Sequence, residues 1–231
     1  CGTSSRHKEY RRQRQMCISD GYDLTGGVGA RHAGEAFGEN YELPNMTAYN
    51  ETCAAISMVY LFERMFLLHG ESKYIDCMER TLYNGVISGM SMDGGRFFYP
   101  NPLSSDGKYK FNADGNTTRQ PWFGCACCPS NLCRFIPSVP GYLYGVKDNN
   151  IYVNLFAGNT STIKVNGKDV VLEETTEYPW NGDIKIAVKK SGVKNASLLV
   201  RIPGWVRNPV VPRDLYKSSD CLLSTCDAAA A

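Results

Sequence analysis

The chain has 231 residues, a length that suits one large domain or two small ones. Hydrophobic residues make up 43%, charged residues 21% and aromatic residues 11%, which is a globular composition and excludes an intrinsically disordered chain. There are 25 Lys and Arg against 23 Asp and Glu, so the net charge of +2 gives no reason to expect a nucleic acid or an anionic membrane as a partner. Polar residues interrupt the apolar stretches, so no membrane-spanning helix is expected.

The two ends suggest that the sequence is part of a longer protein. It begins at Cys1 and not at a methionine, no signal peptide follows, and it stops in a run of alanines after Asp227. The basic residues of the first 20 positions indicate a solvated end of the chain.

The first half carries a helical pattern. In residues 53–69 apolar residues recur at steps of three and four, which predicts an amphipathic helix; the stripe is Ala54, Met58, Leu61, Met65 and Leu68. Residues 72–90 repeat the pattern with Ile75, Met78, Leu82, Val86 and Ile87. Because Gly70 between them is a typical helix stop, we expect an antiparallel pair of helices.

A third helix is expected over residues 131–144, where Pro137 and Pro140 would shorten or kink it. From Asn150 onward the apolar period is two, in the short runs IYVNLFA, STIKVNG, KDVVLEE, DIKIAVKK and ASLLVRIPGW. Turn residues separate these runs, so this half is predicted to be an antiparallel β-sandwich. The whole chain is therefore expected to be an α+β multidomain fold with a boundary near residue 145.

One carboxylate and four thiols form the first candidate site: Glu51, Cys53, Cys125, Cys127 and Cys128. Carboxylate and thiolate are both zinc ligands, and four of them make a tetrahedral site. Glu51 and Cys53 are two residues apart, so they can converge on one ion only in extended backbone or at the entry to a helix.

Pro129 predicts extended backbone at the preceding Cys128. Two other interpretations of these cysteines stay open. They could be buried free thiols, since free cysteine is among the most buried residue types. Alternatively, Cys125 and Cys128 have the CxxC spacing of a redox pair.

The second feature is the Gly-rich stretch GGVGARHAGEAFGENYELPN, which contains Glu35 and His32. A carboxylate in a partly apolar setting can be a general acid, although a surface acid is the simpler interpretation. The stretch lacks the third glycine of a Rossmann motif and the Lys-Ser/Thr of a P-loop, so no nucleotide binding is expected. Near the cysteines three loop aromatics could stack on a sugar or cap the core: Tyr99, Trp122 and Phe123.

The segments GEAFGENYELPN, TAYNETCAAI, RTLYNGVISGMSMDGGRFFYPNPL and PWFGCACCPSN resemble glycoside hydrolase family 127, the β-L-arabinofuranosidase family, and LLVRIPGW resembles its β-domain signature. The resemblance runs from about Gly26 to about Tyr216 and implies an (α/α)6 barrel followed by β-sandwich domains. Residues 1–145 would then be the C-terminal part of the catalytic barrel, without its N-terminal part. Residues 146–231 would be an incomplete β-sandwich domain.

The resemblance implies a retaining glycosidase that releases non-reducing-end β-L-arabinofuranose from plant-type glycans. The ligands of a Zn²⁺ cofactor would be Glu51, Cys53, Cys127 and Cys128. Cys127 would also be the nucleophile that forms a thioglycosyl-enzyme, and Glu35 would be the general acid and then the base. Tyr99, which matches a tyrosine near the nucleophile, and His32 are the expected substrate contacts.

Zinc would stabilise the thiolate that such a nucleophile needs. A zinc-thiolate site favours a reducing, cytoplasmic setting without excluding export. The expected partner is the arabinofuranoside substrate, with neither nucleic acid nor membrane, and the parent protein is hypothesised to form a homodimer. The competing hypothesis is a non-catalytic carbohydrate-binding fragment, in which the same four ligands form a structural zinc site.

Overall fold

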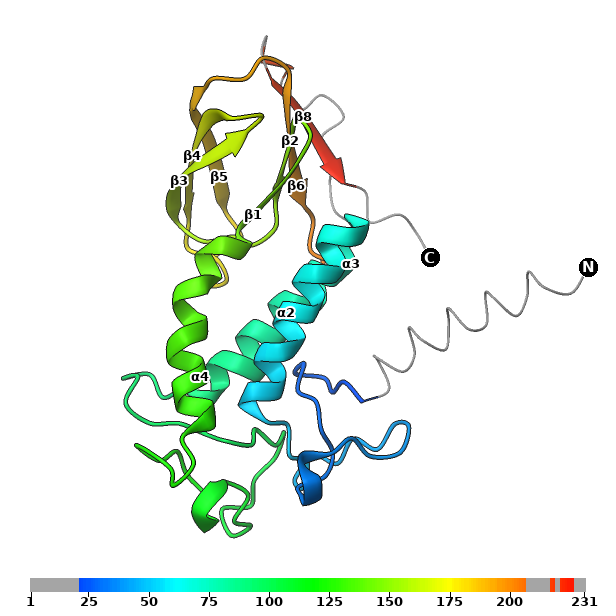
Figure 1. Cartoon of the computed structure of the whole chain (residues 1–231), viewed down its shortest axis with the longest axis vertical. Coiled ribbons are helices and arrows are strands. Elements are labelled where there is room, and N and C mark those ends of the chain that lie inside the picture. The colour runs from blue at the N-terminus through cyan, green and yellow to red at the C-terminus, as the bar shows by residue number, and fades with distance from the viewer. Residues whose placement is uncertain (1–20, 207–216, 219–220, 227–231) are drawn as a thin grey trace, which may run out of the picture. The chain divides into compact units, whose positions relative to one another are not determined.

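The computed structural model describes residues 21–206, 217–218 and 221–226 (Figure 1). The chain divides into two compact units, of which the first contains Cys1–Phe62 and Cys77–Pro137 and the second Glu63–Asp76 and Ser138–Ala231. Helices and two small sheets are both present, so the expected mixed α and β content is confirmed. The domain boundary near residue 145 stays a prediction.

The helices lie in the first two thirds of the chain. In chain order they are η1 (Ala33–Glu35), α2 (Thr52–His69), α3 (Ser72–Arg80) with its π-helical continuation η2 (Thr81–Val86) and 3-10 end η3 (Ile87–Gly89), η4 (Ala113–Gly115), and α4 (Cys127–Phe135) with its 3-10 continuation η5 (Ile136–Tyr142). The two long predicted helices are therefore confirmed to within a residue or two at their ends.

The predicted apolar stripe of α2 is not its buried face. Ala55, Val59 and Phe62 are buried, whereas Leu61 and Leu68 of the predicted stripe are 37% and 76% exposed. Apolar residues occupy almost every side of this helix, so a period of 3.6 residues could not identify which side faces the core.

The second helical segment runs back antiparallel to α2, as expected. Its predicted stripe is buried except for Ile87, which is 39% exposed. A Cβ atom at Gly89 would lie 2.7 Å from Thr52 Oγ1, and one at Gly85 would lie 3.2 Å from Ala55 Cβ. Because glycine has no Cβ, the end of this segment can approach the first turn of α2 this closely.

The third helix begins at Cys127, earlier than predicted, and the expectation of extended backbone at Cys128 was wrong. Pro129 lies in the first turn of α4, where backbone N–H groups have no acceptor within the helix, so the proline removes no hydrogen bond there. The predicted shortening is confirmed: the α-helix ends at Phe135, and the segment around Pro137 and Pro140 continues as a 3-10 helix.

By length and apolar composition, α2 is the one helix among the described residues that could cross a membrane. Length and composition alone do not test insertion, so the expectation that the chain has no membrane-spanning helix stays a prediction. Core helices pass the same test, and a third of the apolar window of α2 is buried inside the protein (33%). Its composition is thus weak evidence for insertion into a membrane.

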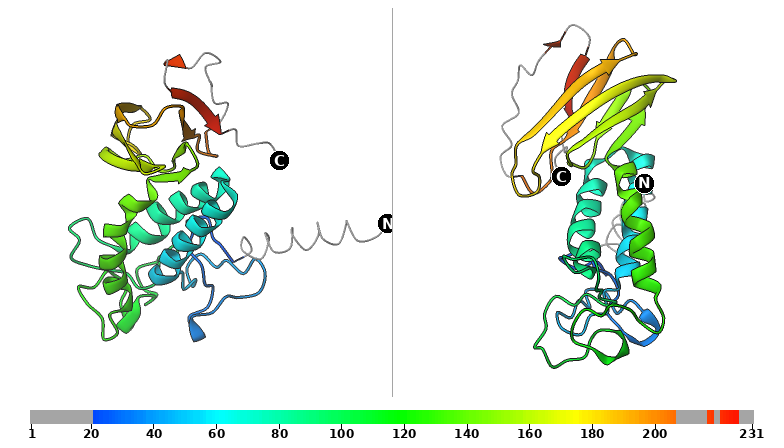
Figure 2. Two further views of the ribbon diagram at one scale, coloured as in Figure 1. Left: turned by 45° about the horizontal axis from the view of Figure 1, so that its top comes forward. Right: turned by 90° about the vertical axis from the view of Figure 1, so that its left-hand side faces the viewer.

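Eight strands follow among the described residues: β1 (Tyr144–Lys147), β2 (Asn150–Val153), β3 (Asn159–Val165), β4 (Lys168–Thr176), β5 (Ile184–Ser191), β6 (Ala196–Arg201), β7 (Lys217–Ser218) and β8 (Cys221–Cys226). They form a five-stranded sheet of order β1-β2-β6-β8-β7 and a three-stranded sheet of order β3-β4-β5 (Figure 2). The small sheet is antiparallel, as expected. In the large sheet β6 pairs parallel with both β2 and β8, so the expectation of purely antiparallel strands was wrong there.

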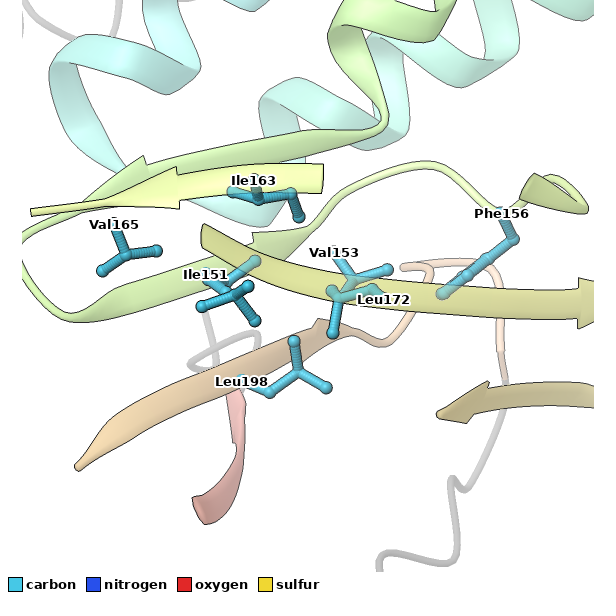
Figure 3. Close-up of a cluster of buried hydrophobic side chains, with 8 residues drawn as sticks. Ile151, Val153, Phe156, Ile163, Val165, Leu172 and Leu198 are labelled. Atoms are coloured by element: carbon cyan, nitrogen blue, oxygen red, sulfur yellow. The ribbon is translucent and has the colours of Figure 1, made fainter. Parts of the chain in front are cut away.

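Side chains of both sheets share one hydrophobic core (Figure 3). Ile151 and Leu198 come from the large sheet, and Val165 and Leu172 from the small one, each at most 4% exposed. These residues alternate with less buried ones along their strands, which is the period of two seen in the sequence.

A buried ion pair joins β6 to α3 in the second unit. Arg201 Nη1 lies 2.6 Å from Asp76 Oδ1, its Nε donates to the Asn154 carbonyl oxygen at 2.6 Å, and its side chain is 2% exposed.

The variant Asp76→Ala leaves this guanidinium buried without its carboxylate, so we expect the free energy of unfolding to fall by about 3–5 kcal/mol in urea titrations. The control Asp169→Ala removes the exposed partner of Lys164 and should change it little. Equal effects of the two variants would contradict this account.

Candidate metal centre

Four of the predicted site residues converge in the first unit. One ligand atom from each of Glu51, Cys53, Cys127 and Cys128 lies within 4.8 Å of every other. Cys53 Sγ is 3.1 Å from Cys127 Sγ, and Glu51 Oε1 is 3.3 Å from Cys128 Sγ and 4.0 Å from Cys127 Sγ. The structure thus brings together residues that are up to 77 positions apart in the sequence.

Two helix N-termini position these side chains. Glu51 forms an isolated bridge with Pro100 directly before α2, and the N–H of Thr52 donates to the carbonyl oxygen of Tyr99 at 2.9 Å. Cys53 lies in the first turn of α2, and Cys127 begins α4. The N-terminus of a helix carries partial positive charge, which favours thiolates there. The spacing argument for Glu51 and Cys53 at a helix entry agrees with this geometry.

The pKa values of the clustered groups determine how many of the three thiols are ionised. Hydrogen bonds from Cys128 and Cys127 lower the pKa of Cys53 to about 6. The same contact with Cys53, together with burial, raises the pKa of Cys127 to about 11 and raises that of Cys128 further. Burial raises the pKa of Glu51 to about 7. At neutral pH and without a cation the cluster therefore holds one thiolate and two thiols.

The donor set fits a divalent metal ion. Zinc with sulfur ligands at about 2.3 Å places neighbouring ligand atoms about 3.8 Å apart in a tetrahedron. Three of the six separations among these four atoms, 3.1, 3.3 and 4.0 Å, lie near that value. Glu51 and Cys128 are buried, and a buried acidic cluster of this kind is stabilised by a cation.

Glu35 lies at the edge of this cluster and is linked to it through Tyr49. Glu35 is exposed at the end of η1, and its Oε1 accepts a hydrogen bond of 3.0 Å from the Tyr49 hydroxyl. Tyr49 is 9% exposed, and its pKa is raised strongly, first by burial and then by the negative charges of Glu51 and Glu35. Sequence reasoning did not single out Tyr49, although it lies two residues before Glu51.

His32 packs against the ring of Tyr49. The two rings make an edge contact with centroids 4.8 Å apart. Partial burial lowers the pKa of His32, which favours a neutral imidazole. The structure thus places His32 beside the ring that contacts Glu35.

The predicted aromatic residues have different surroundings. Tyr99 is 7% exposed, its ring meets Phe123 edge-on at 5.4 Å, and its hydroxyl donates to Cys125 Sγ at 3.7 Å. Phe123 is buried and belongs to the core, whereas Trp122 is 59% exposed. The core alternative thus applies to Phe123, whereas stacking of Tyr99 or Trp122 on a sugar stays a prediction.

Comparisons with known proteins show which family the chain matches. Residues 14–141 match the model of the β-L-arabinofuranosidase GH127 catalytic domain, and residues 150–214 match that of the GH127 middle domain. A non-reducing end β-L-arabinofuranosidase from Bifidobacterium longum subsp. longum is 35% identical over 192 residues, which cover 80% of this chain and 29% of that protein.

Solved structures give the same relationship. A GH127 β-arabinofuranosidase superposes with a TM-score of 0.78 at 56% sequence identity. The match covers 91% of this chain and 32% of the chain of that enzyme. A GH127 β-L-arabinofuranosidase from Geobacillus stearothermophilus T6 has a TM-score of 0.73 at 41% identity, with coverage of 82% and 31%.

These matches define the class of protein as a glycoside hydrolase. The chain belongs to the GH127 β-L-arabinofuranosidase family. It spans about a third of the length of the relatives it matches.

Proposed function

We propose that this chain supplies the zinc site, the nucleophile and the acid/base residue of a retaining β-L-arabinofuranosidase. The observation that carries the proposal is the convergence of Glu51 and three cysteines in a chain of the GH127 family. Its substrate would be a non-reducing-end β-L-arabinofuranoside, because its relatives are named as β-L-arabinofuranosidases. In the whole protein the helical part would belong to an (α/α)6 barrel and the two sheets to a β-sandwich.

Exposure distinguishes the three thiols and favours Cys127 as the nucleophile. Cys127 is exposed, whereas Cys53 is half-buried and Cys128 is completely buried at 0% exposure. A sugar arriving from solvent can therefore reach the sulfur of Cys127 before that of the other two. The contact with Tyr99 also lowers the pKa of Cys127, although the neighbouring Cys53 and burial outweigh it.

The proposed reaction is a double displacement. A zinc ion held by Glu51, Cys53, Cys127 and Cys128 would supply the positive charge that keeps the thiols ionised. The Cys127 sulfur attacks the anomeric carbon with its electron pair, and the glycosidic bond breaks while Glu35 donates its proton to the leaving oxygen. The Glu35 carboxylate then takes a proton from water, whose oxygen displaces the sulfur, so the anomeric configuration is retained.

The neighbouring side chains have supporting roles in this proposal. The hydroxyl of Tyr49 holds one oxygen of Glu35 and leaves the other available for the leaving group. Its hydrogen bond fixes the carboxyl group in place, and the neutral imidazole of His32 packs against the same ring. Tyr99 and His32 would contact the sugar.

The competing hypothesis is a closed structural zinc site without catalysis. Alkylation of the zinc-loaded chain with iodoacetamide, followed by peptide mass spectrometry, separates the two. The proposed function predicts that Cys127 is labelled much faster than Cys53 and Cys128, because it is exposed. Uniform protection of all three cysteines by zinc would support the structural site and overturn the catalytic one.

Zinc binding should be strongly pH-dependent because the ligands must lose their protons. At pH 8 the pKa values of about 6 for Cys53 and about 7 for Glu51 leave both ionised, while Cys127 and Cys128 stay protonated because their pKa values are raised. Binding therefore releases about two protons at this pH, and the association constant should rise by about two orders of magnitude per pH unit. Competition with a chromogenic chelator between pH 7.5 and 8.5 measures this slope, and a pH-independent constant would contradict it.

A further inference from the structure

Asp23, a buried carboxylate outside the proposed ligand set, contacts Asn50, the residue that directly precedes the ligand Glu51. Asp23 is 5% exposed, and its Oδ1 accepts hydrogen bonds of 2.7–2.8 Å from the N–H and hydroxyl of Thr25 and from the N–H of Gly27. Its Oδ2 accepts from the side-chain amide of Asn50. The mechanism proposed above does not use Asp23.

Asn50 has an unusual backbone conformation. Its φ is +40°, in the left-handed region that L side chains seldom adopt, and its side chain is 3% exposed. Its N–H donates to the Gly29 carbonyl at 2.9 Å, and its carbonyl accepts from the N–H of Asn101 at 3.0 Å. Within the described part of the chain, its side-chain amide is held by the hydrogen bond to Asp23.

Gly27 packs tightly against the contact between Asn50 and Asp23. A Cβ atom at Gly27 would lie 2.8 Å from Asn50 Cγ and 3.0 Å from Asp23 Oδ2, so only glycine fits beside it. Asn50 directly precedes Glu51, and its conformation sets the direction in which the backbone enters α2. A change to extended backbone at Asn50 would turn Glu51 away from the three thiols.

We propose that Asp23 is a positioning residue of the metal centre: by holding Asn50 in its left-handed conformation it directs the Glu51 carboxylate toward Cys53, Cys127 and Cys128. The inference rests on the proposed function, since it assumes that these four residues bind zinc. Asp23 lies 28 positions before Glu51, the ligand it orients, and it acts through Asn50 without touching the cluster.

The test compares the zinc affinity of four variants of the 231-residue chain with that of the wild type, by competition with a chromogenic chelator. Asn50→Ala removes the amide and leaves a side chain at positive φ, whereas Asn50→Gly removes the same amide and tolerates positive φ. Asp23→Ala removes the carboxylate, and Asp23→Ala combined with Asn50→Gly completes a double-mutant cycle. Unfolding of each metal-free variant, measured with excess chelator, reports stability separately.

Asn50→Ala and Asp23→Ala should each weaken zinc binding by about 10-fold or more, the usual effect of losing a group that orients a metal ligand. Asn50→Gly should stay within about threefold of the wild type, and adding Asp23→Ala to it should cause no further loss. With cobalt as the probe, the thiolate-to-metal absorption should persist in all variants while the ligand-field bands change in the two weakened ones, because only the carboxylate moves.

Four results would overturn the inference: unchanged zinc affinity in Asp23→Ala, equal losses in Asn50→Ala and Asn50→Gly, an undiminished effect of Asp23→Ala in the Asn50→Gly background, or a wild type without zinc. The last result also overturns the proposed function, whereas the first three leave it intact. Should Asp23→Ala fail to fold, the comparison of Asn50→Ala with Asn50→Gly still decides whether the backbone conformation matters.

Discussion

The variant Cys127→Ser should hydrolyse an aryl β-L-arabinofuranoside at least about a thousandfold more slowly than the wild-type chain, because a serine hydroxyl ionises far less readily than a thiol and lacks the nucleophilicity of sulfur. Cys127 is the exposed thiol of the cluster, so its sulfur is the one that the sugar can reach. Zinc should largely remain, since Glu51, Cys53 and Cys128 still provide three ligands, the number that catalytic zinc sites commonly have.

The matched control is Cys125→Ser, two residues earlier in the loop that leads into α4. Cys125 is also exposed, but its sulfur accepts a hydrogen bond from Tyr99 and does not belong to the four-ligand group. Its activity should stay within a few-fold of the wild type. Full activity in Cys127→Ser, or an equal loss in both variants, would contradict the assignment of the nucleophile. Chromogenic release of the aryl group measures all three proteins.

The second large effect is expected on metal binding. Cys53→Ser should weaken zinc binding by more than about 100-fold, because losing a group that only orients a ligand already costs 10–100-fold. Cys53 has the lowest pKa of the three thiols, about 6, and accepts hydrogen bonds from both of the others, so its removal takes away the thiolate around which the cluster is arranged.

Competition with a chromogenic chelator at pH 8 measures this loss. Cys133→Ser serves as the control, since Cys133 lies in the same helix as Cys127 but is exposed and outside the ligand group. It should bind zinc as the wild type does. An equal affinity of Cys53→Ser and Cys133→Ser would show that Cys53 is not a ligand.

Much of the candidate site could be predicted because its signals are local. The spacing of Glu51 and Cys53 at the start of a helical pattern indicates a site there. Cys127 and Cys128 stand out because neighbouring thiols are rare. Strand positions followed from alternation, and the Asn166-Gly167 turn, with φ of +49° and +76°, joins β3 to β4 as such a dipeptide predicts.

The remaining features depend on contacts between distant residues. No sequence pattern shows that Asp23 meets Asn50 or that Tyr49 meets Glu35, because each contact needs the fold to bring two segments together. The buried face of α2 was missed since that helix is apolar on nearly every side. The parallel pairing of β2 with β6 was missed because alternation along a strand carries no information about the direction of its neighbour.

The most direct test of the central claim is the zinc content of the purified 231-residue chain, determined by metal analysis on the wild type and Cys53→Ser side by side. We expect one zinc per wild-type chain and a clear loss in the variant. A folded wild-type chain that contains no zinc, and takes up none when it is supplied, would contradict it.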